Sequence, residues 1–126
     1  MILVADDSPD NSVLMEYLLT ARGHEVRLAA DGAEAVRLAK TLEPDLVLMD
    51  IQMPVMDGYQ ALRGIRGLGD RESPPVVAVT AGAMVGDREK VLAAGFSGYI
   101  RKPIAPETFV DEVEALLEGG SAGGYP

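Results

Sequence analysis

Asp45-Leu46-Val47-Leu48-Met49-Asp50 is the stretch of the sequence that decides the fold. Its four consecutive apolar residues predict a short strand that is buried on both faces, as in the middle of a parallel sheet. Asp50 then falls at the carboxyl end of this strand, the edge at which open α/β sheets bind their ligands. Since a lone aspartate after a strand is more often a helix cap or a solvated turn, the interpretation depends on which residues end the other strands.

Short apolar runs alternate along the chain with stretches that have a helical pattern. The expected strands are residues 2–5, 25–28, 46–49, 76–79 and 98–100. The expected helices start where proline suits the first turn or aspartate suits a cap, at Ser8-Pro9, Asp31, Asp57-Gly58, Asp87 and Pro106. In the first helix the apolar face is expected to consist of Val13, Leu14, Tyr17, Leu18 and Ala21. In the last helix the acids are expected to face water, namely Asp111, Glu112, Glu114 and Glu118.

This strict alternation predicts a flavodoxin-like, doubly wound (βα)5 fold of the α/β class, with helices on both faces of a parallel sheet. Right-handed crossovers leave two common strand orders, and the one that suits five strands is 2-1-3-4-5. The first and third strands are neighbours in this order, so Asp6, Asp7 and Asp50 are expected to share one crevice. Residues 1–118 are expected to form the domain, and the Gly- and Ser-rich residues 119–126 a flexible tail.

The composition is that of an acidic globular domain. The chain has 126 residues, no cysteine, and a formal net charge of −9. Without cysteine it has no disulfide framework and no thiolate metal site, and its negative charge argues against direct binding to nucleic acid. No apolar run approaches the ~18 residues of a membrane span, and the N-terminus opens into a strand without a signal-peptide pattern. We therefore expect a cytoplasmic protein with no membrane insertion.

The residues at the strand ends suit phosphoryl transfer. Three carboxylates in one crevice repel one another unless a cation lies between them, and oxygen ligands without His or Cys favour Mg²⁺ or Mn²⁺ over Zn²⁺. Lys102 follows the fifth strand and offers a point charge for phosphate, while Thr80 follows the fourth strand and offers a hydroxyl donor. Each residue alone has a simpler structural explanation, but together they predict an aspartate that accepts a phosphoryl group.

Four segments resemble the signature segments of response-regulator receiver domains: Ile2-Leu3-Val4-Ala5-Asp6-Asp7, residues 46–58, Val79-Thr80-Ala81 and Tyr99-Ile100-Arg101-Lys102-Pro103. The resemblance as a whole extends over residues 1 to about 118. The resemblance implies that Asp50 is the phosphorylated residue. It also implies that Asp7 and Asp50 bind Mg²⁺ directly with the backbone carbonyl of Gln52. Asp6 would hold the ion through water.

The same resemblance assigns roles to the residues that end the fourth and fifth strands. Thr80 would be the switch hydroxyl that moves to the phosphoryl group, Tyr99 the aromatic switch, and Lys102 the phosphate contact. The Lys102-Pro103 bond resembles the cis peptide bond of the family. Residues 81–90 are closest to stand-alone cell-cycle regulators and to receivers attached to hybrid sensor kinases.

The implied function is a phosphoacceptor switch of a two-component phosphorelay, which is not an enzyme beyond its own phosphorylation and dephosphorylation. The donor would be a histidine kinase or a His-phosphotransfer protein. Output would be a downstream protein bound by the surface of the helix from Asp87, the strand at residues 98–100 and the helix from Pro106.

Two other functions of this fold fit the residues less well. A Mg²⁺-dependent phosphohydrolase with an Asp nucleophile needs a second Asp two residues further on, where this chain has Gln52. A flavodoxin-like cofactor site needs a Gly- and hydroxyl-rich loop after the first strand, and the sequence Asp6-Asp7-Ser8-Pro9 would repel a phosphate there.

Overall fold

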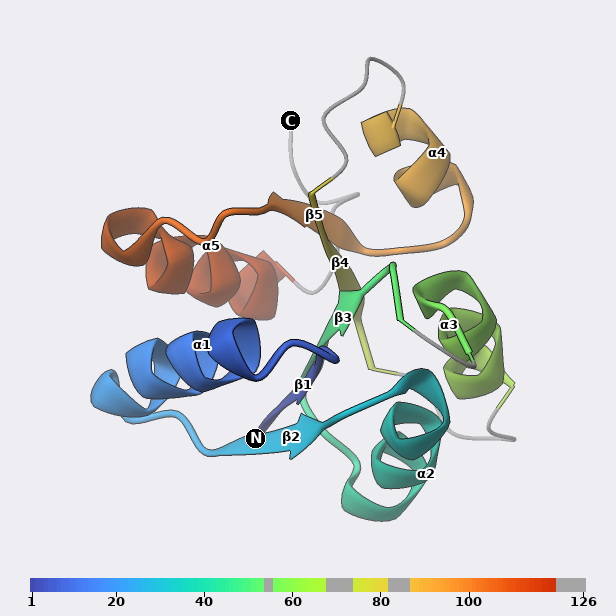
Figure 1. Cartoon of the computed structure of the whole chain (residues 1–126), viewed down its shortest axis with the longest axis horizontal. Coiled ribbons are helices and arrows are strands. Elements are labelled where there is room, and N and C mark those ends of the chain that lie inside the picture. Colours follow the sequence, from blue (N-terminus) through green and yellow to red (C-terminus); the bar gives the residue numbers. More distant parts are fainter. Residues whose placement is uncertain (54–55, 68–73, 82–86, 120–126) are drawn as a thin grey trace.

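The computed structural model describes residues 1–53, 56–67, 74–81 and 87–119, and it has alternating strands and helices throughout (Figure 1). The elements in chain order are β1 (Ile2–Ala5), α1 (Pro9–Ala21), β2 (Val26–Ala29), α2 (Gly32–Leu42), β3 (Leu46–Asp50), α3 (Gly58–Arg66), β4 (Val76–Thr80), α4 (Asp87–Ala93), β5 (Gly98–Arg101) and α5 (Pro106–Gly119). The strands form one parallel sheet in the order β2-β1-β3-β4-β5. The predicted doubly wound fold and its strand order are confirmed. Apart from Gly119, the predicted tail lies outside the described residues.

The sheet has a separate hydrophobic core on each face. Helices α1 and α5 cover one face, and α2, α3 and α4 cover the other (Figure 1). Alternate residues of β3 serve the two cores: Leu46 and Leu48 pack on the α1–α5 side, and Val47 and Met49 pack on the α2–α4 side. Because β3 is buried along its whole length, the continuous apolar run of the sequence is explained.

The predicted helix starts agree with the structure, and their caps are visible at α2 and α3. Asp57 and Gln60 form a reciprocal capping box at α3, in which each side chain accepts the other's backbone N–H. At α2 the Asp31 side chain accepts the N–H of Glu34, whose own carboxylate accepts the N–H of Ala30 at 2.9 Å. Strands β3, β4 and β5 each extend one residue further than predicted, so Asp50 and Thr80 are the last residues of their strands.

The predicted apolar face of α1 is largely wrong. Val13 and Tyr17 are 56% and 68% exposed, and Ala21 is also exposed. The helix instead buries a row one position away, with Leu14 and Leu18 at its margin: Ser12, Met15 and Leu19. The physical reason is that α1 is apolar on most of its circumference, so helical spacing alone leaves its orientation undecided.

One predicted water-facing acid joins α1 to α5 instead. Glu114 on α5 forms an ion pair with Arg22 at 3.0 Å, and its second carboxylate oxygen lies 2.8 Å from His24 Nε2. Asp111, one turn earlier, lies 3.3 Å from the second guanidinium nitrogen of Arg22. In the described part of the chain, no helix has the length and apolar character needed to cross a membrane.

Candidate functional site

The candidate site lies at the carboxyl edge of the sheet, between β1 and β3. These strands pair in register through Ala5 and Met49, so the aspartates that follow them come side by side. Carboxylate oxygens of Asp6, Asp7 and Asp50 all lie within 4.8 Å of one another. Asp6 and Asp50 are buried at 3% and 4% exposure, whereas Asp7 is exposed and opens the cluster to solvent. The structure therefore brings together the three carboxylates that the sequence placed in one crevice.

Lys102, which directly follows β5, extends its ammonium group to this cluster. Its Nζ atom lies 3.0 Å from Asp6 Oδ2 and 3.4 Å from Asp50 Oδ2. The Lys102 backbone N–H donates to the Thr80 carbonyl at 2.8 Å, and the Lys102-Pro103 peptide bond is cis. These contacts fix the chain after β5 against the end of β4 and hold the ammonium group beside two buried carboxylates.

The carboxylate oxygens are only partly satisfied by the protein. Asp6 Oδ1 accepts the N–H of Ser8 at 2.8 Å, and Asp50 Oδ1 accepts the N–H of Gln52 at 3.1 Å. Asp6 Oδ2 is buried and accepts no hydrogen bond of good geometry from the described residues. Lys102 compensates its charge from 3.0 Å without a well-directed bond, so lone pairs of this atom remain available to a ligand.

The electrostatics of the site favour an additional cation. The pKa of Asp50 is raised from 3.8 to about 6, because burial and the negative charge of Asp6 outweigh the opposing effects of the Gln52 N–H and Lys102. For Lys102, burial lowers the pKa, but the close contact with Asp6 and the negative charges of Asp50 and Asp6 outweigh this effect and raise the pKa above 10.5. Among the described residues, the Lys102 ammonium group thus pairs with two carboxylates of a cluster of three.

The donor set fits a hard divalent ion. It consists of oxygens, one carboxylate is open to solvent, and neither His nor Cys belongs to the cluster. Mg²⁺ prefers one or two carboxylates together with water and phosphate oxygens, and the buried, unsatisfied Asp6 Oδ2 is suited to a water of such an ion. The residues present therefore fit Mg²⁺.

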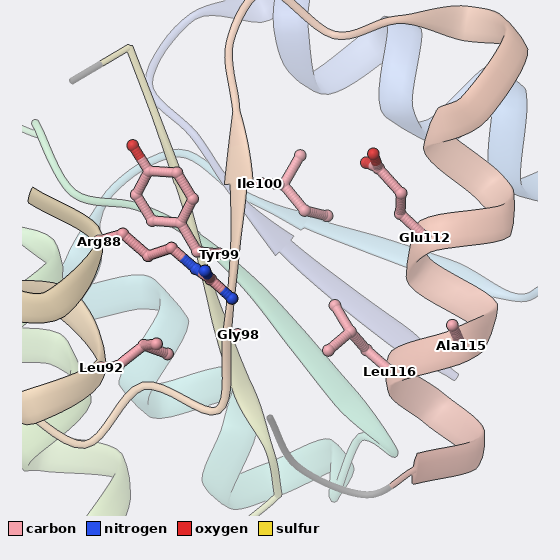
Figure 2. A pocket seen from close by; sticks show the side chains of 8 residues that line it. All are labelled: Arg88, Leu92, Gly98, Tyr99, Ile100, Glu112, Ala115 and Leu116. Atoms are coloured by element: carbon pink, nitrogen blue, oxygen red, sulfur yellow. The ribbon is translucent and has the colours of Figure 1, made fainter. Parts of the chain in front are cut away.

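The other predicted residues lie at the same edge but not in the cluster. Thr80 ends β4 and is 5% exposed, one position beyond the residue that pairs with Asp50. Gln52 follows Asp50 by two residues, with an exposed side chain. Tyr99 is half-buried on β5, and Figure 2 shows its ring on the α4 side of the strand, near Arg88.

Two glycines border the site in a way that the sequence did not reveal. A Cβ atom at Gly58 would lie 2.7 Å from the Asp50 carbonyl oxygen, and one at Gly32 would meet the Met56 carbonyl oxygen at under 3.0 Å. The available signal was the pair Asp-Gly at two helix starts, Asp31-Gly32 and Asp57-Gly58, which is explained equally well by capping alone.

Comparison with known families identifies the family to which this chain belongs. The family model of the response regulator receiver domain matches residues 2–114. The chain belongs to this family. Receiver domains are the domains of two-component systems that histidine kinases phosphorylate.

Curated relatives include both small regulators and large kinases. The polar-differentiation response regulator DivK of Brucella anthropi is 35% identical over 116 residues, which cover 92% of this chain and 94% of DivK. The signal transduction histidine-protein kinase BarA of Escherichia coli K12 is 46% identical over 106 residues, which cover 84% of this chain. The matched region spans only 12% of the length of BarA.

Solved structures agree with the fold. The receiver domain of the sensor histidine kinase PA1611 from Pseudomonas aeruginosa PAO1, described with a magnesium ion in its active site cleft, has 39% identity and a TM-score of 0.80 over 94% of each chain. The chemotaxis response regulator CheY4 of Vibrio cholerae has 29% identity and a TM-score of 0.84, over 91% of this chain and 96% of CheY4.

Proposed function

We propose that this receiver domain is a Mg²⁺-dependent phosphoacceptor switch, in which Asp50 takes a phosphoryl group from a phosphohistidine of a kinase or phosphotransfer protein. The observation that carries the proposal is the convergence of Asp6, Asp7 and Asp50 within 4.8 Å, with Lys102 beside them. The ion would be held by Asp7, Asp50 and the Gln52 carbonyl, with Asp6 acting through water. Magnesium was found in the active site cleft of the related PA1611 receiver, which supports this choice of ion.

The chemistry asks little of the protein beyond position and charge. Asp50 Oδ1 is engaged by the Gln52 N–H, so Oδ2, 3.4 Å from Lys102 Nζ, is the nucleophile. Its attack forms an O–P bond as the N–P bond of the phosphohistidine breaks, and the imidazole leaves with the electron pair. With a pKa of about 6, Asp50 is ionised in about nine of ten molecules at pH 7. A bound Mg²⁺ would neutralise negative charge on the phosphoryl oxygens, and Lys102 would add to this effect.

The signal would leave through the α4–β5–α5 surface. Two adjoining grooves, of about 290 Å³ and 580 Å³, share Arg88, Tyr99, Ile100 and Glu112, and the larger one extends to Lys102. Figure 2 shows the walls of the smaller groove, with Arg88 and Leu92 reaching in from α4 and Glu112 and Leu116 from α5. A Thr80 hydroxyl drawn to the phosphoryl group and a Tyr99 ring that follows it would reshape this surface for a downstream protein.

The donor would contact the exposed residues of α1. This helix begins two residues after Asp7, and Pro9, Asp10, Val13, Leu14 and Tyr17 line a groove of about 480 Å³ on it. A protein that brings a phosphohistidine to Asp50 must cover this region. Tyr17→Ser should therefore slow phosphorylation by a phosphorylated donor protein and leave phosphorylation by acetyl phosphate unchanged, because the small donor needs no docking surface. Equal slowing of both reactions would contradict this role.

Treatment with acetyl phosphate and Mg²⁺ tests the function. We expect one phosphoryl group per chain, labile to hydroxylamine as an acyl phosphate is. Borohydride should trap it at Asp50, and it should be absent from Asp50→Asn. Retention of the label in that variant would refute the assignment. Turnover of many phosphate esters without a stable acyl phosphate would favour the phosphohydrolase instead.

Activation and domain extent have their own tests. Beryllofluoride, a phosphoryl mimic, should shift the amide NMR signals of α4 and β5 as well as those near the aspartates; shifts confined to the aspartate loops would contradict the proposed output surface.

We place the switch in the cytoplasm, where ATP supplies phosphohistidine. Residues 1–119, up to the end of α5, should be phosphorylated as fast as the full chain, since we assign the residues after α5 to a tail.

A further inference from the structure

Helix α3 begins directly against the backbone of the phosphoacceptor. A Cβ atom at Gly58 would lie 2.7 Å from the Asp50 carbonyl oxygen and 2.7 Å from Ile51 Cα. The Gly58 N–H donates to the Ile51 carbonyl oxygen at 2.9 Å. The crowded atoms belong to the backbone, so no rotation of a side chain relieves the clash. Gly58 is thus required for space, because its φ angle is not among the positive ones.

A second glycine holds the same connection from the side of α2. Gly32 is the first residue of α2, and a Cβ atom there would meet the Met56 carbonyl oxygen at under 3.0 Å. Met56 precedes the Asp57 cap and Gly58 of α3. The amino ends of two helices therefore contact described residues of the β3–α3 connection, α3 at Asp50–Ile51 and α2 at Met56.

Resting on the proposed function, we propose that Gly58 is a positioning residue for phosphoryl transfer. Because Gly58 has no side chain, α3 can pack directly against the Asp50–Ile51 peptide and thereby fix the orientation of the Asp50 carboxylate. Gln52 is fixed with it, since its N–H donates to Asp50 Oδ1 at 3.1 Å. The close packing of α3 at Gly58 would thus position both the nucleophile Asp50 and the backbone of Gln52, a proposed metal ligand.

The size of the effect follows from the contacts. In Gly58→Ala the 2.7 Å contacts must lengthen to about 3.4 Å, where ordinary van der Waals contact begins. Either α3 withdraws or the Asp50–Ile51 peptide moves toward the cluster. Since a misplacement on this scale costs a reaction roughly ten- to a hundredfold, we expect at least a tenfold slower reaction of Asp50.

Gly64 provides a matched control within the same helix. A Cβ atom there would meet Val36 Cγ2 at 3.0 Å and Cγ1 at 3.2 Å, which are side-chain atoms of α2 and not the backbone of β3. Gly64→Ala therefore strains the packing of α3 on α2 without touching Asp50. Gly67→Ala, where the nearest atom is 3.4 Å away, serves as the unperturbed reference.

The experiment compares wild type with these three variants in the full chain. The measurements are the melting temperature, the rate of Asp50 phosphorylation at saturating acetyl phosphate and Mg²⁺, the Mg²⁺ affinity, and the amide NMR signal of Gln52 without metal. We expect Gly58→Ala to lose at least about tenfold in rate, to bind Mg²⁺ more weakly and to shift the Gln52 signal. Gly64→Ala should melt lower yet react within about twofold of wild type.

Two results with folded variants would overturn the proposal: a Gly58→Ala that reacts within about twofold of wild type, or a Gly64→Ala that loses as much rate as Gly58→Ala. If Gly58→Ala melts too low, all four proteins are measured in trimethylamine N-oxide, which favours the folded state. A variant that stays unfolded even there would assign Gly58 to stability alone and also overturn the proposal. A wild type that takes up no label at Asp50 would instead refute the proposed function.

Discussion

Replacing Asp50 by asparagine should stabilise the metal-free protein. The pKa of Asp50 is raised from 3.8 to about 6, so keeping this buried carboxylate ionised at neutral pH costs about 3 kcal/mol, at about 1.4 kcal/mol per pKa unit. The amide is nearly isosteric and keeps an acceptor for the Gln52 N–H, and the raised pKa already includes the opposing attraction of Lys102 at 3.4 Å. We therefore expect a gain on the order of 1–3 kcal/mol, or at least about 3 °C in melting temperature.

The gain should depend on pH in a defined direction. Because the folded Asp50 binds its proton more tightly than the unfolded one, the wild type loses stability as the pH rises from about 4 to about 6. The variant has no such carboxyl group. Its advantage should therefore be small below pH 4, grow through this interval and stay constant above it.

Thermal melts in EDTA from pH 4 to pH 8 measure this directly. Glu25→Gln is the control, since it removes one exposed carboxylate before β2 and should change stability by less than about 0.5 kcal/mol. Mg²⁺ at a hundredfold excess over its Kd should stabilise the wild type by about 2.7 kcal/mol, and Asp50→Asn by less. A variant that melts below wild type in EDTA at pH 7, or whose advantage is the same at every pH, would refute the reasoning.

Other variants test the surroundings of the site and the core. Lys102→Met removes the only ammonium group within 4.0 Å of Asp6 and Asp50 in the described residues, so the pKa of Asp50 should rise above 6 in an NMR titration; an unchanged or lower midpoint would show that Lys102 does not act on it. Glu114→Gln removes the ion pair with Arg22 and alters the contact with His24, and it should cost up to about 1 kcal/mol in urea unfolding at low salt, with a smaller loss at 1 M salt; an equal loss would exclude an electrostatic origin. On α1, Leu19→Ala should cost about 2–5 kcal/mol and Tyr17→Ser less than about 0.5 kcal/mol, and a reversed order would contradict the observed orientation of the helix.

The fold and the carboxylate cluster could be predicted because both follow from local patterns. The run from Leu46 to Met49 specifies a strand buried on both faces, and the alternation with helices specifies a parallel sheet. In such a sheet all strands end at one edge, so the positions of Asp6 and Asp50 in the sequence are enough to bring them together.

What could not be predicted depends on close approach between elements distant in the sequence. The orientation of α1 was undecided, because Val13 and Tyr17 are as apolar as the buried Met15 and Leu19. The contact of Gly58 with Asp50 depends on how near α3 comes to β3, and neither spacing nor propensity specifies that distance.

The negative charges of the site, which lower the stability of the metal-free protein, also bear on the proposed switch. The proposed phosphorylation would replace one carboxylate charge of Asp50 with a group of about −1.5 to −2, in a place where Lys102 is already shared between two buried carboxylates. A bound Mg²⁺ would compensate part of this charge, and hydrogen-bond donors that can reach the phosphoryl oxygens would compensate the rest. Thr80 carries a hydroxyl at the end of the neighbouring strand and is 5% exposed, so its movement toward the phosphoryl group would disturb buried packing. On this view the excess negative charge that destabilises the resting site is also what couples phosphorylation to the rearrangement of β4 and β5.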